Sequence, residues 1–218
     1  SPEDGEFHYL KVLPSGECLY RYQEELRSFR MDVIAKVLDT DAPGIIPKIV
    51  TLVKEVRFFE VFPGRDIVYI NKEYQLQRYG REVPDAKPFS AQIKAMYKFE
   101  NYLFTAYGSG IGCYNFNTLV KLDYISNYVE GAGDYPYTPN SDRALTVFRY
   151  RHTIHGITMY NNTGSLGVFV LLRGSTLFMV GSYKIGDNLK KMKGIVQVGS
   201  KLRFIVFGEQ NIHSLAIL

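Results

Sequence analysis

The feature that most constrains the fold is a regular succession of short strand-like segments after Lys48. They are rich in β-branched and aromatic residues and are separated by Gly, Pro, Asn or Asp. Strands this short, with turn signals about every 8–12 residues, are typical of all-β sandwiches, barrels and propellers. We therefore expect an all-β, mainly antiparallel fold. The expected strands lie within residues 49–62, 66–79, 93–99, 102–107, 110–116, 119–125, 145–151, 156–160, 166–172, 176–182, 194–198, 202–207 and 212–218.

One earlier segment has helical spacing instead. Its apolar residues step by three or four positions, which places them on one helical face. We expect a short N-terminal helix over residues 19–37, ended by two prolines and a glycine in residues 39–47. The alternative is two strands, at residues 17–22 and 31–38. The spaced apolar residues are Leu19, Tyr22, Leu26, Phe29, Val33 and Val37.

Length and composition favour an ordinary globular protein. The chain has 218 residues, 46% hydrophobic and 22% charged, which suits one β-rich domain over residues 8–218 with a long surface loop at 126–142. Residues 1–7 are acidic and polar, so we expect a cloning remnant there rather than a signal peptide. Two cysteines are too few for a disulfide scaffold. No uncharged run has the length and apolarity of a membrane span. These observations favour an intracellular location, in the cytoplasm or nucleus.

A weak internal repeat narrows the choice of fold. Residues 102–112 (YLFTAYGSGIG) and 176–186 (TLFMVGSYKIG) both place Ile-Gly eight residues after Leu-Phe. Their offset, from Leu103 to Leu177, is 74 residues, or twice 37. An apolar strand, a turn and a second apolar strand that recur at this period are typical of stacked four-stranded blades.

At this point the chain resembles a WD40-type β-propeller. The best unit is Ala91–Ile125, with Leu103-Phe104-Thr105-Ala106 and the Gly-rich hairpin Gly108-Ser109-Gly110. Tyr114-Asn115 stands where the family has its Trp-Asp dipeptide. The chain has no Trp and no Gly-His pair before this unit, so the family's buried His–Asp network is not carried over. The resemblance implies a whole or partial propeller. A β-sandwich or a mixed β-rich domain is the alternative.

Two basic clusters interrupt an otherwise mixed charge pattern. Residues 184–203 have a net charge of +5, more than the +4 of the whole chain, and residues 143–151 interleave arginines with Phe148 and Tyr150. Such clusters bind an acidic protein, a phosphate backbone or an anionic membrane surface, or they are solvated hairpin tips. We take as candidate partner-binding cations Lys184, Lys190, Lys191, Lys193, Lys201, Arg203, Arg149 and Arg151.

Tyrosines form the second candidate surface. Tyr128, Tyr135 and Tyr137 lie in the Gly- and Pro-rich loop expected at residues 126–142. Large, stiff and amphipathic side chains of this kind are enriched at protein interfaces. They either contact a partner or pack back onto their own sheet.

The patterns that would indicate an enzyme or a cofactor site are weak. The glycines of residues 108–112 precede a strand-like segment rather than a helix, so they fit a hairpin better than a phosphate loop. His152 and His155 have an H-x-x-H spacing, which in a strand points the two rings to opposite faces. Cys113 sits within an expected strand and fits a small buried hydrophobe. We expect no cofactor, no metal and no small-molecule substrate.

The sequence therefore favours a non-enzymatic protein–protein interaction module, a scaffold subunit of an intracellular multiprotein assembly. A nucleic-acid-binding module that uses residues 143–151 and 184–203 is the first alternative. An enzyme whose site is assembled from residues distant in sequence is the second.

Overall fold

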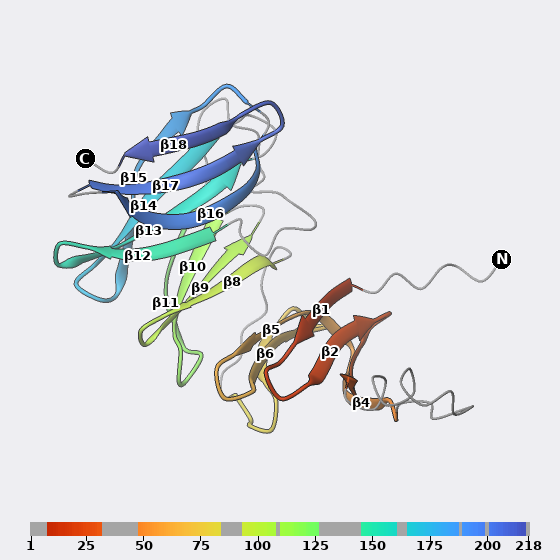
Figure 1. The fold of residues 1–218 in the computed structure, drawn as a ribbon. Coiled ribbons are helices and arrows are strands. Elements are labelled where there is room, and N and C mark those ends of the chain that lie inside the picture. Colours follow the sequence, from red (N-terminus) through yellow and green to blue (C-terminus); the bar gives the residue numbers. More distant parts are fainter. Residues whose placement is uncertain are drawn as a thin grey trace. The chain divides into compact units, whose positions relative to one another are not determined.

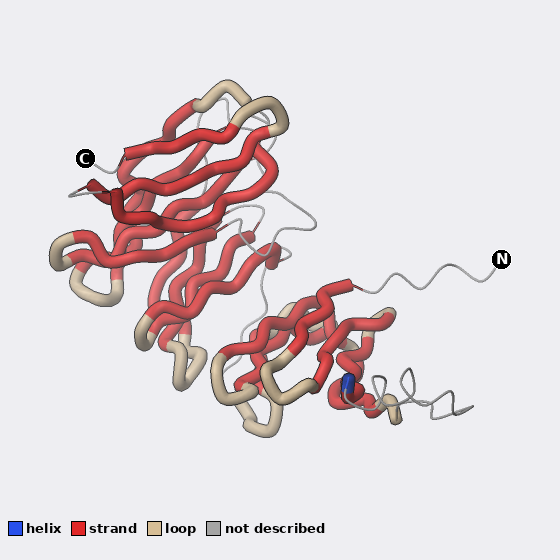
Figure 2. Tube along the Cα trace, viewed as in Figure 1, coloured by secondary structure: helices blue, strands red, loops and turns tan. Residues whose placement is uncertain are grey.

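The named elements of the chain are all β-strands (Figures 1 and 2). They form five antiparallel sheets of three or four strands in the described residues, with sequential strands as neighbours in every sheet. The all-β antiparallel fold expected from the sequence is confirmed. The computed structural model describes residues 8–31, 48–83, 93–107, 110–126, 145–160, 165–187, 189–198 and 201–216.

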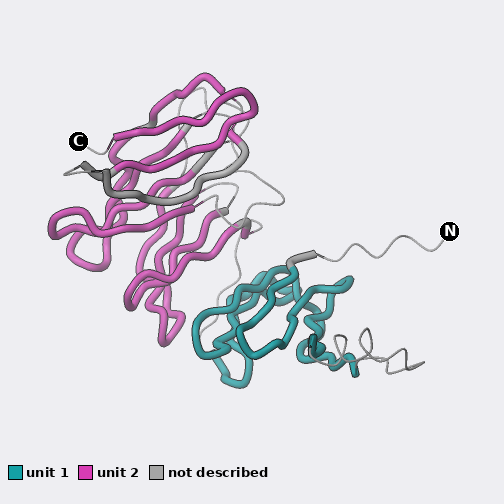
Figure 3. Tube along the Cα trace, in the orientation of Figure 1, with its two compact units in different colours: residues 1–89 teal, residues 90–218 magenta. Residues whose placement is uncertain are grey.

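The chain divides into two compact units, residues 1–89 and residues 90–218 (Figure 3). Each unit has its own hydrophobic clusters between its own sheets. The single β-rich domain expected over residues 8–218 stays a prediction. The calls for a remnant at residues 1–7 and a loop at 126–142 fall outside the described residues, except for Ser126, which ends a strand.

The first unit contains two sheets, a four-stranded and a three-stranded one, around one core. Leu19 and Leu26 of the four-stranded sheet pack with Phe59 and Ile67 of the three-stranded sheet, and all four side chains are almost fully buried. The first sheet has the order β1 (His8–Val12), β2 (Glu17–Tyr22), β3 (Glu25–Arg30) and β4 (Val50–Lys54). The second has the order β5 (Val56–Phe62), β6 (Asp66–Asn71) and β7 (Leu76–Arg78).

The helix expected over residues 19–37 is wrong in its described part, because residues 17–30 form the hairpin of β2 and β3. The alternative of a strand at residues 17–22 is confirmed. Cys18, Leu19 and Tyr20 are all buried, so this strand is covered on both faces, which an amphipathic helix is not. The three- and four-residue spacing misled because it runs across the turn, where Gln23 has a φ of 53°.

A bidentate ion pair joins the two sheets of the first unit. The Nε and Nη2 atoms of Arg65, in the turn between β5 and β6, donate to the two carboxylate oxygens of Glu17 on β2 at 2.6 and 2.8 Å. This hydrogen bond lowers the pKa of Glu17 below its usual value of 4.5. The ionised form of Glu17 therefore stabilises the folded unit.

We predict that Glu17→Gln lowers the free energy of unfolding of the first unit by about 1 kcal/mol or less at pH 7, the usual size for a surface pair. Because the folded pKa of Glu17 is lowered, its contribution is present above the usual carboxyl pKa and is lost as the pH falls through the folded value. The difference from wild type should therefore shrink as the pH falls below the usual carboxyl pKa and through the lowered folded one. Urea unfolding followed by hydrogen exchange in β2 and β5 measures it. An equal effect of Glu82→Gln, an exposed carboxylate of the same unit, would contradict this assignment.

The second unit stacks three sheets. In sequence order they contain β8 (Ile93–Phe99), β9 (Tyr102–Tyr107), β10 (Gly110–Asn115) and β11 (Lys121–Ser126); then β12 (Leu145–Tyr150), β13 (Thr153–Tyr160), β14 (Ser165–Leu172) and β15 (Thr176–Lys184); then β16 (Leu189–Val198), β17 (Lys201–Gly208) and β18 (Ile212–Ala216). We call them the first, middle and third sheets of this unit. Nearly all of these strands were expected from the sequence.

The middle sheet packs on both faces. On one face the rings of Phe169 and Phe104 lie 5.8 Å apart between the middle and first sheets. On the other face Ile157 and Leu166 pack with Phe204 of the third sheet. Buried apolar residues on both faces explain why these strands read as nearly continuous hydrophobic runs rather than alternating ones.

Gly156 makes room for the ring of Phe169 within the middle sheet. The two residues are cross-strand partners in β13 and β14, and a Cβ atom at position 156 would lie 1.9 Å from Cζ of Phe169. Phe169 has no exposed surface, so its ring cannot move aside without disturbing the core.

We predict that Gly156→Ala destabilises the second unit by roughly 1–3 kcal/mol, because the added methyl group overpacks the core. Chemical denaturation followed by tyrosine fluorescence measures the change. Gly181→Ala in β15 is the matched control, since a Cβ atom there would meet nothing within 4 Å. Equal stabilities of the two variants would contradict the packing described here.

Candidate interaction surface

The hairpin turns of the first and middle sheets lie at one common end, which we call the hairpin end (Figure 1). It contains the turns β8–β9, β10–β11, β12–β13 and β14–β15. The first two turns are joined directly, since the backbone N–H of Phe116 donates to the carbonyl of Asn101 at 2.8 Å. Glu100, Arg151 and Arg173 each have a φ between 50° and 53°, so three of these turns are tight bends that present charged side chains.

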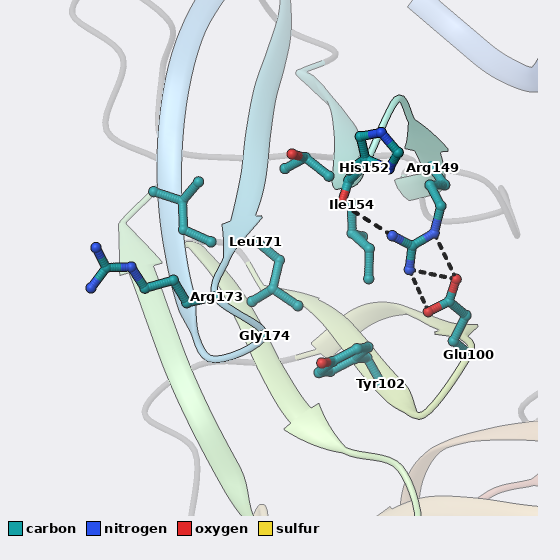
Figure 4. Close-up of a pocket in the computed structure, with 10 residues that line it drawn as sticks. Glu100, Tyr102, Arg149, His152, Ile154, Leu171, Arg173 and Gly174 are labelled. Atoms are coloured by element: carbon teal, nitrogen blue, oxygen red, sulfur yellow. Dashed lines mark hydrogen bonds and ion pairs between the residues drawn. The ribbon is translucent and has the colours of Figure 1, made fainter.

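A pocket of about 260 Å³ opens at the hairpin end between the first and middle sheets (Figure 4). The β8–β9 turn contributes Glu100 and Tyr102. The β12–β13 turn contributes Arg149 and His152, and the β14–β15 turn contributes Arg173 and Gly174. Its apolar lining comes from Ile154, Leu171 and Leu172. The lining therefore combines an apolar surface with charged groups at the rim.

An ion pair connects the two sheets at the pocket. The Nη2 atom of Arg149 lies 2.7 and 2.8 Å from the two carboxylate oxygens of Glu100, and its Nε atom lies 3.0 Å from one of them. The Nη1 atom also donates to the carbonyl of His152 at 3.2 Å. Figure 4 shows these contacts on one side of the pocket. The pair positions the Arg149 guanidinium but adds no net charge to the lining.

Arg173 differs from Arg149 in its surroundings. Its side chain is exposed, and no ion-pair partner for it occurs among the described residues. In Figure 4 its guanidinium points away from the Arg149–Glu100 pair. Gly174 follows it with a φ of 70° and approaches Tyr102 so closely that a Cβ atom would lie 2.8 Å from the tyrosine hydroxyl. The turn is therefore fixed against the pocket wall while the cation extends into solvent.

Other cations at the hairpin end lie over aromatic rings. The ammonium of Lys98 is 4.8 Å from the centre of the Phe116 ring, and the guanidinium of Arg151 is 5.3 Å from that of Tyr150. Lys121 lies 5.8 Å from the Tyr124 ring. Cation–π contacts of this kind hold long side chains in place. Because these side chains are already ordered in the free protein, they lose less conformational entropy when a partner binds.

The structure brings together part of the first sequence-predicted cluster. Arg149 and Arg151 both lie at the hairpin end and are exposed. Arg143 lies outside the described residues, as do Tyr128, Tyr135 and Tyr137. Their assignment to a partner surface stays a prediction.

The backbone of the second predicted cluster, residues 184–203, extends along a whole strand, and its assignment to a partner surface stays a prediction. Lys184 ends β15 at the end of the sheet opposite its turn with β14, and Lys190, Lys191 and Lys193 follow near the start of β16. Lys201 and Arg203 lie on β17 beside Val198 and Val196, at the other end of that hairpin and toward the hairpin end (Figure 1). Arg203 donates from Nη1 to the Ser214 hydroxyl at 3.2 Å. A run that is continuous in sequence is spread out because a strand carries its residues away at about 3.3 Å each.

The histidine and cysteine candidates have other surroundings. His152 is exposed in the β12–β13 turn, whereas the ring of His155 stacks on Phe148 at 5.7 Å. In the described part of the chain, no group of three or more His, Cys, Asp or Glu side chains is arranged to hold a metal ion. Burial raises the pKa of the Cys113 thiol to about 12, which disfavours the nucleophilic thiolate near neutral pH.

Sequence reasoning missed Glu100, Tyr102 and Arg173 as site residues. The available signal was their position in or beside turns, since loops presented by a rigid scaffold commonly carry binding residues. It also missed a buried carboxylate, Asp187, in the segment just before the third sheet. Asp187 accepts the backbone N–H of Asn211 at 3.0 Å and contacts Nε2 of His213 at 2.9 Å, which ties the turn before β18 to the segment before β16.

Comparisons with known proteins support the fold and no finer identity. No protein-family model matches the chain, and no curated protein matches it by sequence. Among solved structures, BBS1N in complex with ARL6DN matches 100% of this chain and 67% of its own length, with 11% identity and a TM-score of 0.57. Hsv2 of Kluyveromyces lactis and the N-terminal domain of Nup159 each match 98% of this chain, with 9% and 8% identity and TM-scores of 0.50.

The chain has the fold of WD40-like β-propeller proteins, as its sequence resemblance implied. The unit Ala91–Ile125 contains the four strands of the first sheet of the second unit, and Tyr114-Asn115 ends the third of them, β10. The chain spans 63% of the matched Hsv2 chain and 62% of the Nup159 domain. Among the described residues, no helix is long and apolar enough to cross a membrane.

Proposed function

We propose that this chain is a non-enzymatic protein–protein interaction module of an intracellular multiprotein assembly, and that its hairpin end binds an acidic segment of a partner protein. The observation that supports this most is the gathering of cations at the hairpin end, where Lys98, Lys121, Arg151 and Arg173 lie on or beside adjacent turns. Arg149 lies among them but is paired with Glu100, the carboxylate of the pocket lining, so that this pair adds no net charge.

The distribution of charge between the two units supports the same surface. Residues 90–218 contain 13 lysines and arginines against seven aspartates and glutamates, a net charge of +6. Residues 1–89 contain 13 against 15, a net charge of −2. The long-range electrostatic field of the second unit therefore attracts acidic partners. The exposed cations at the hairpin end are the groups that would contact such a partner.

The pocket at the hairpin end favours a protein segment as the partner. A pocket of about 260 Å³ that combines Ile154, Leu171 and Leu172 with charged groups at its rim suits the insertion of one partner side chain, with carboxylates placed at the rim.

The fold similarity is compatible with this role. The matched BBS1N structure is a complex with another protein, ARL6DN. That partner belongs to BBS1N, and nothing in this chain identifies a particular protein. What the present chain shares is a rigid stack of sheets that presents turns from several strands on one surface.

We predict that the double variant Arg151→Glu and Arg173→Glu weakens binding of an acidic peptide by about tenfold or more, because two attractions become repulsions. The probe is a fluorescein-labelled peptide of eight alternating Glu and Asp residues, measured by fluorescence anisotropy at 50 and 200 mM NaCl. Lys184→Glu is the control, since this exposed residue ends β15 at the opposite end from the β14–β15 turn.

A single-stranded oligonucleotide of equal charge is titrated in parallel. Stronger binding of the oligonucleotide, weakened by the same double variant, would replace the proposed partner with a nucleic acid. Peptide binding that Lys184→Glu weakens as much as the double variant would contradict the hairpin end as the site. No binding of the peptide at 50 mM NaCl would contradict the proposal altogether.

A further inference from the structure

The ion pair between Arg149 and Glu100 is open to solvent. Its two side chains are 43% and 44% exposed, whereas Glu17, the carboxylate that joins the two sheets of the first unit, is only 16% exposed. Ion pairs in contact with water contribute little to stability. The first and middle sheets are held together instead by buried rings such as Phe104 and Phe169. The Arg149–Glu100 pair is therefore a contact that the fold does not need and that another carboxylate can replace.

Arg149 is also held from its own turn. Its Nη1 atom donates to the carbonyl of His152, three residues along the chain, at 3.2 Å. This bond uses a different nitrogen from the two that bind Glu100, which are Nε and Nη2. The guanidinium therefore remains oriented when Glu100 moves away. Its Nε–Nη2 edge is the planar fork that binds a carboxylate through two parallel hydrogen bonds.

In the free protein this edge of the guanidinium is already occupied. The Nε atom and the Nη2 atom both donate to the carboxylate of Glu100, at 2.7 to 3.0 Å, and Figure 4 shows Glu100 facing them. These nitrogens have a fixed number of hydrogens, so a second carboxylate cannot bind the same edge at the same time. A partner carboxylate therefore has to displace Glu100 to bind Arg149 in this way.

Further cations around the pair favour such a displacement. Arg151 and Arg173 are exposed in neighbouring turns, and neither has an ion-pair partner among the described residues. Lys98 and Lys121 lie beside the same group of turns. A single carboxylate binds one cation at a time, whereas a segment with several carboxylates interacts with several cations together. Such a segment can displace Glu100 where an isolated carboxylate cannot.

We propose that Glu100 is an internal competitor of the partner, and that it occupies on Arg149 the position that a carboxylate of the acidic partner segment takes in the complex. This inference rests on the proposed function and adds to it the contact atoms and a residue that sets the affinity. The apparent affinity is lowered in proportion to the fraction of molecules in which Glu100 covers Arg149. Glu100 thereby selects segments with several carboxylates over segments with one.

The first experiment removes the competitor by Glu100→Asn. Asparagine is neutral and shorter, and it tolerates the left-handed φ of 53° at this position. The fluorescein-labelled acidic peptide is titrated by anisotropy at 50 mM NaCl. We expect the variant to bind it about two- to fivefold more tightly than wild type, the range for release from an exposed ion pair.

The matched control is Glu209→Asn. Glu209 is an exposed carboxylate of the same unit, in the turn between β17 and β18, and its replacement makes the same change in net charge. Its effect on peptide binding should be clearly smaller, because Glu209 is not paired with Arg149.

The second experiment observes Arg149 directly. Exchange of its Nε–H with water is measured by ¹⁵N NMR in the full chain. In the Glu100→Asn variant alone this N–H loses its carboxylate acceptor, so its exchange should become faster than in wild type. Saturating peptide should make the exchange slow again, because a peptide carboxylate replaces Glu100. A change in net charge alone would not restore this protection.

The outcomes separate this inference from the proposed function. Equal peptide affinities of the Glu100→Asn and Glu209→Asn variants would overturn the inference, as would an Arg149 Nε–H that still exchanges fast with peptide bound. In either case, wild-type binding that depends on Arg151 and Arg173 would leave the proposed function standing. No peptide binding by wild type or by the Glu100→Asn variant would contradict both.

Discussion

The second unit depends on a sheet that is apolar on both faces. Phe169 and Leu166 lie on opposite faces of the same strand, β14, and neither side chain has any exposed surface. One packs against the first sheet and the other against the third. A sheet of this kind has no stable solvated face, so it requires a neighbouring sheet on each side. Stacking then fixes the positions of the turns, and the turns define the pocket that Glu100 and Arg149 help to line.

The fold was largely predictable because strand length and turn chemistry are local properties. The segments from residue 66 to 79 and from 93 to 125 were expected nearly as the structure has them, since Asn, Gly and Pro mark the turns directly. The helix at 19–37 failed because three-residue spacing also arises across a tight hairpin. Gly80, Pro84 and Pro88 mark a loop before residue 89, but breakers do not tell which sheets share a core, so the two compact units are visible only in the structure.

The candidate site was less predictable than the fold. Arg149 and Arg151 were visible as a basic cluster next to aromatic residues, and the structure places both at the hairpin end. Glu100 lies 49 positions from Arg149, so only the stacking of two sheets reveals their ion pair. Conversely, residues 184–203 are continuous in sequence, but their backbone extends along the whole length of β16. Local charge density identifies candidate cations, but the register of strands decides which of them share a surface.

The central claim is that the hairpin end of the second unit is the surface that binds a partner protein. Lysine cross-linking of the chain purified with its native partners, after nuclease treatment, tests it most directly. Lys98 and Lys121 lie at this end, whereas Lys184 lies at the far end of β15. The account predicts cross-links from Lys98 and Lys121 to an acidic segment of a nuclease-resistant partner. Intermolecular cross-links confined to Lys184, with none from Lys98 or Lys121, would contradict it.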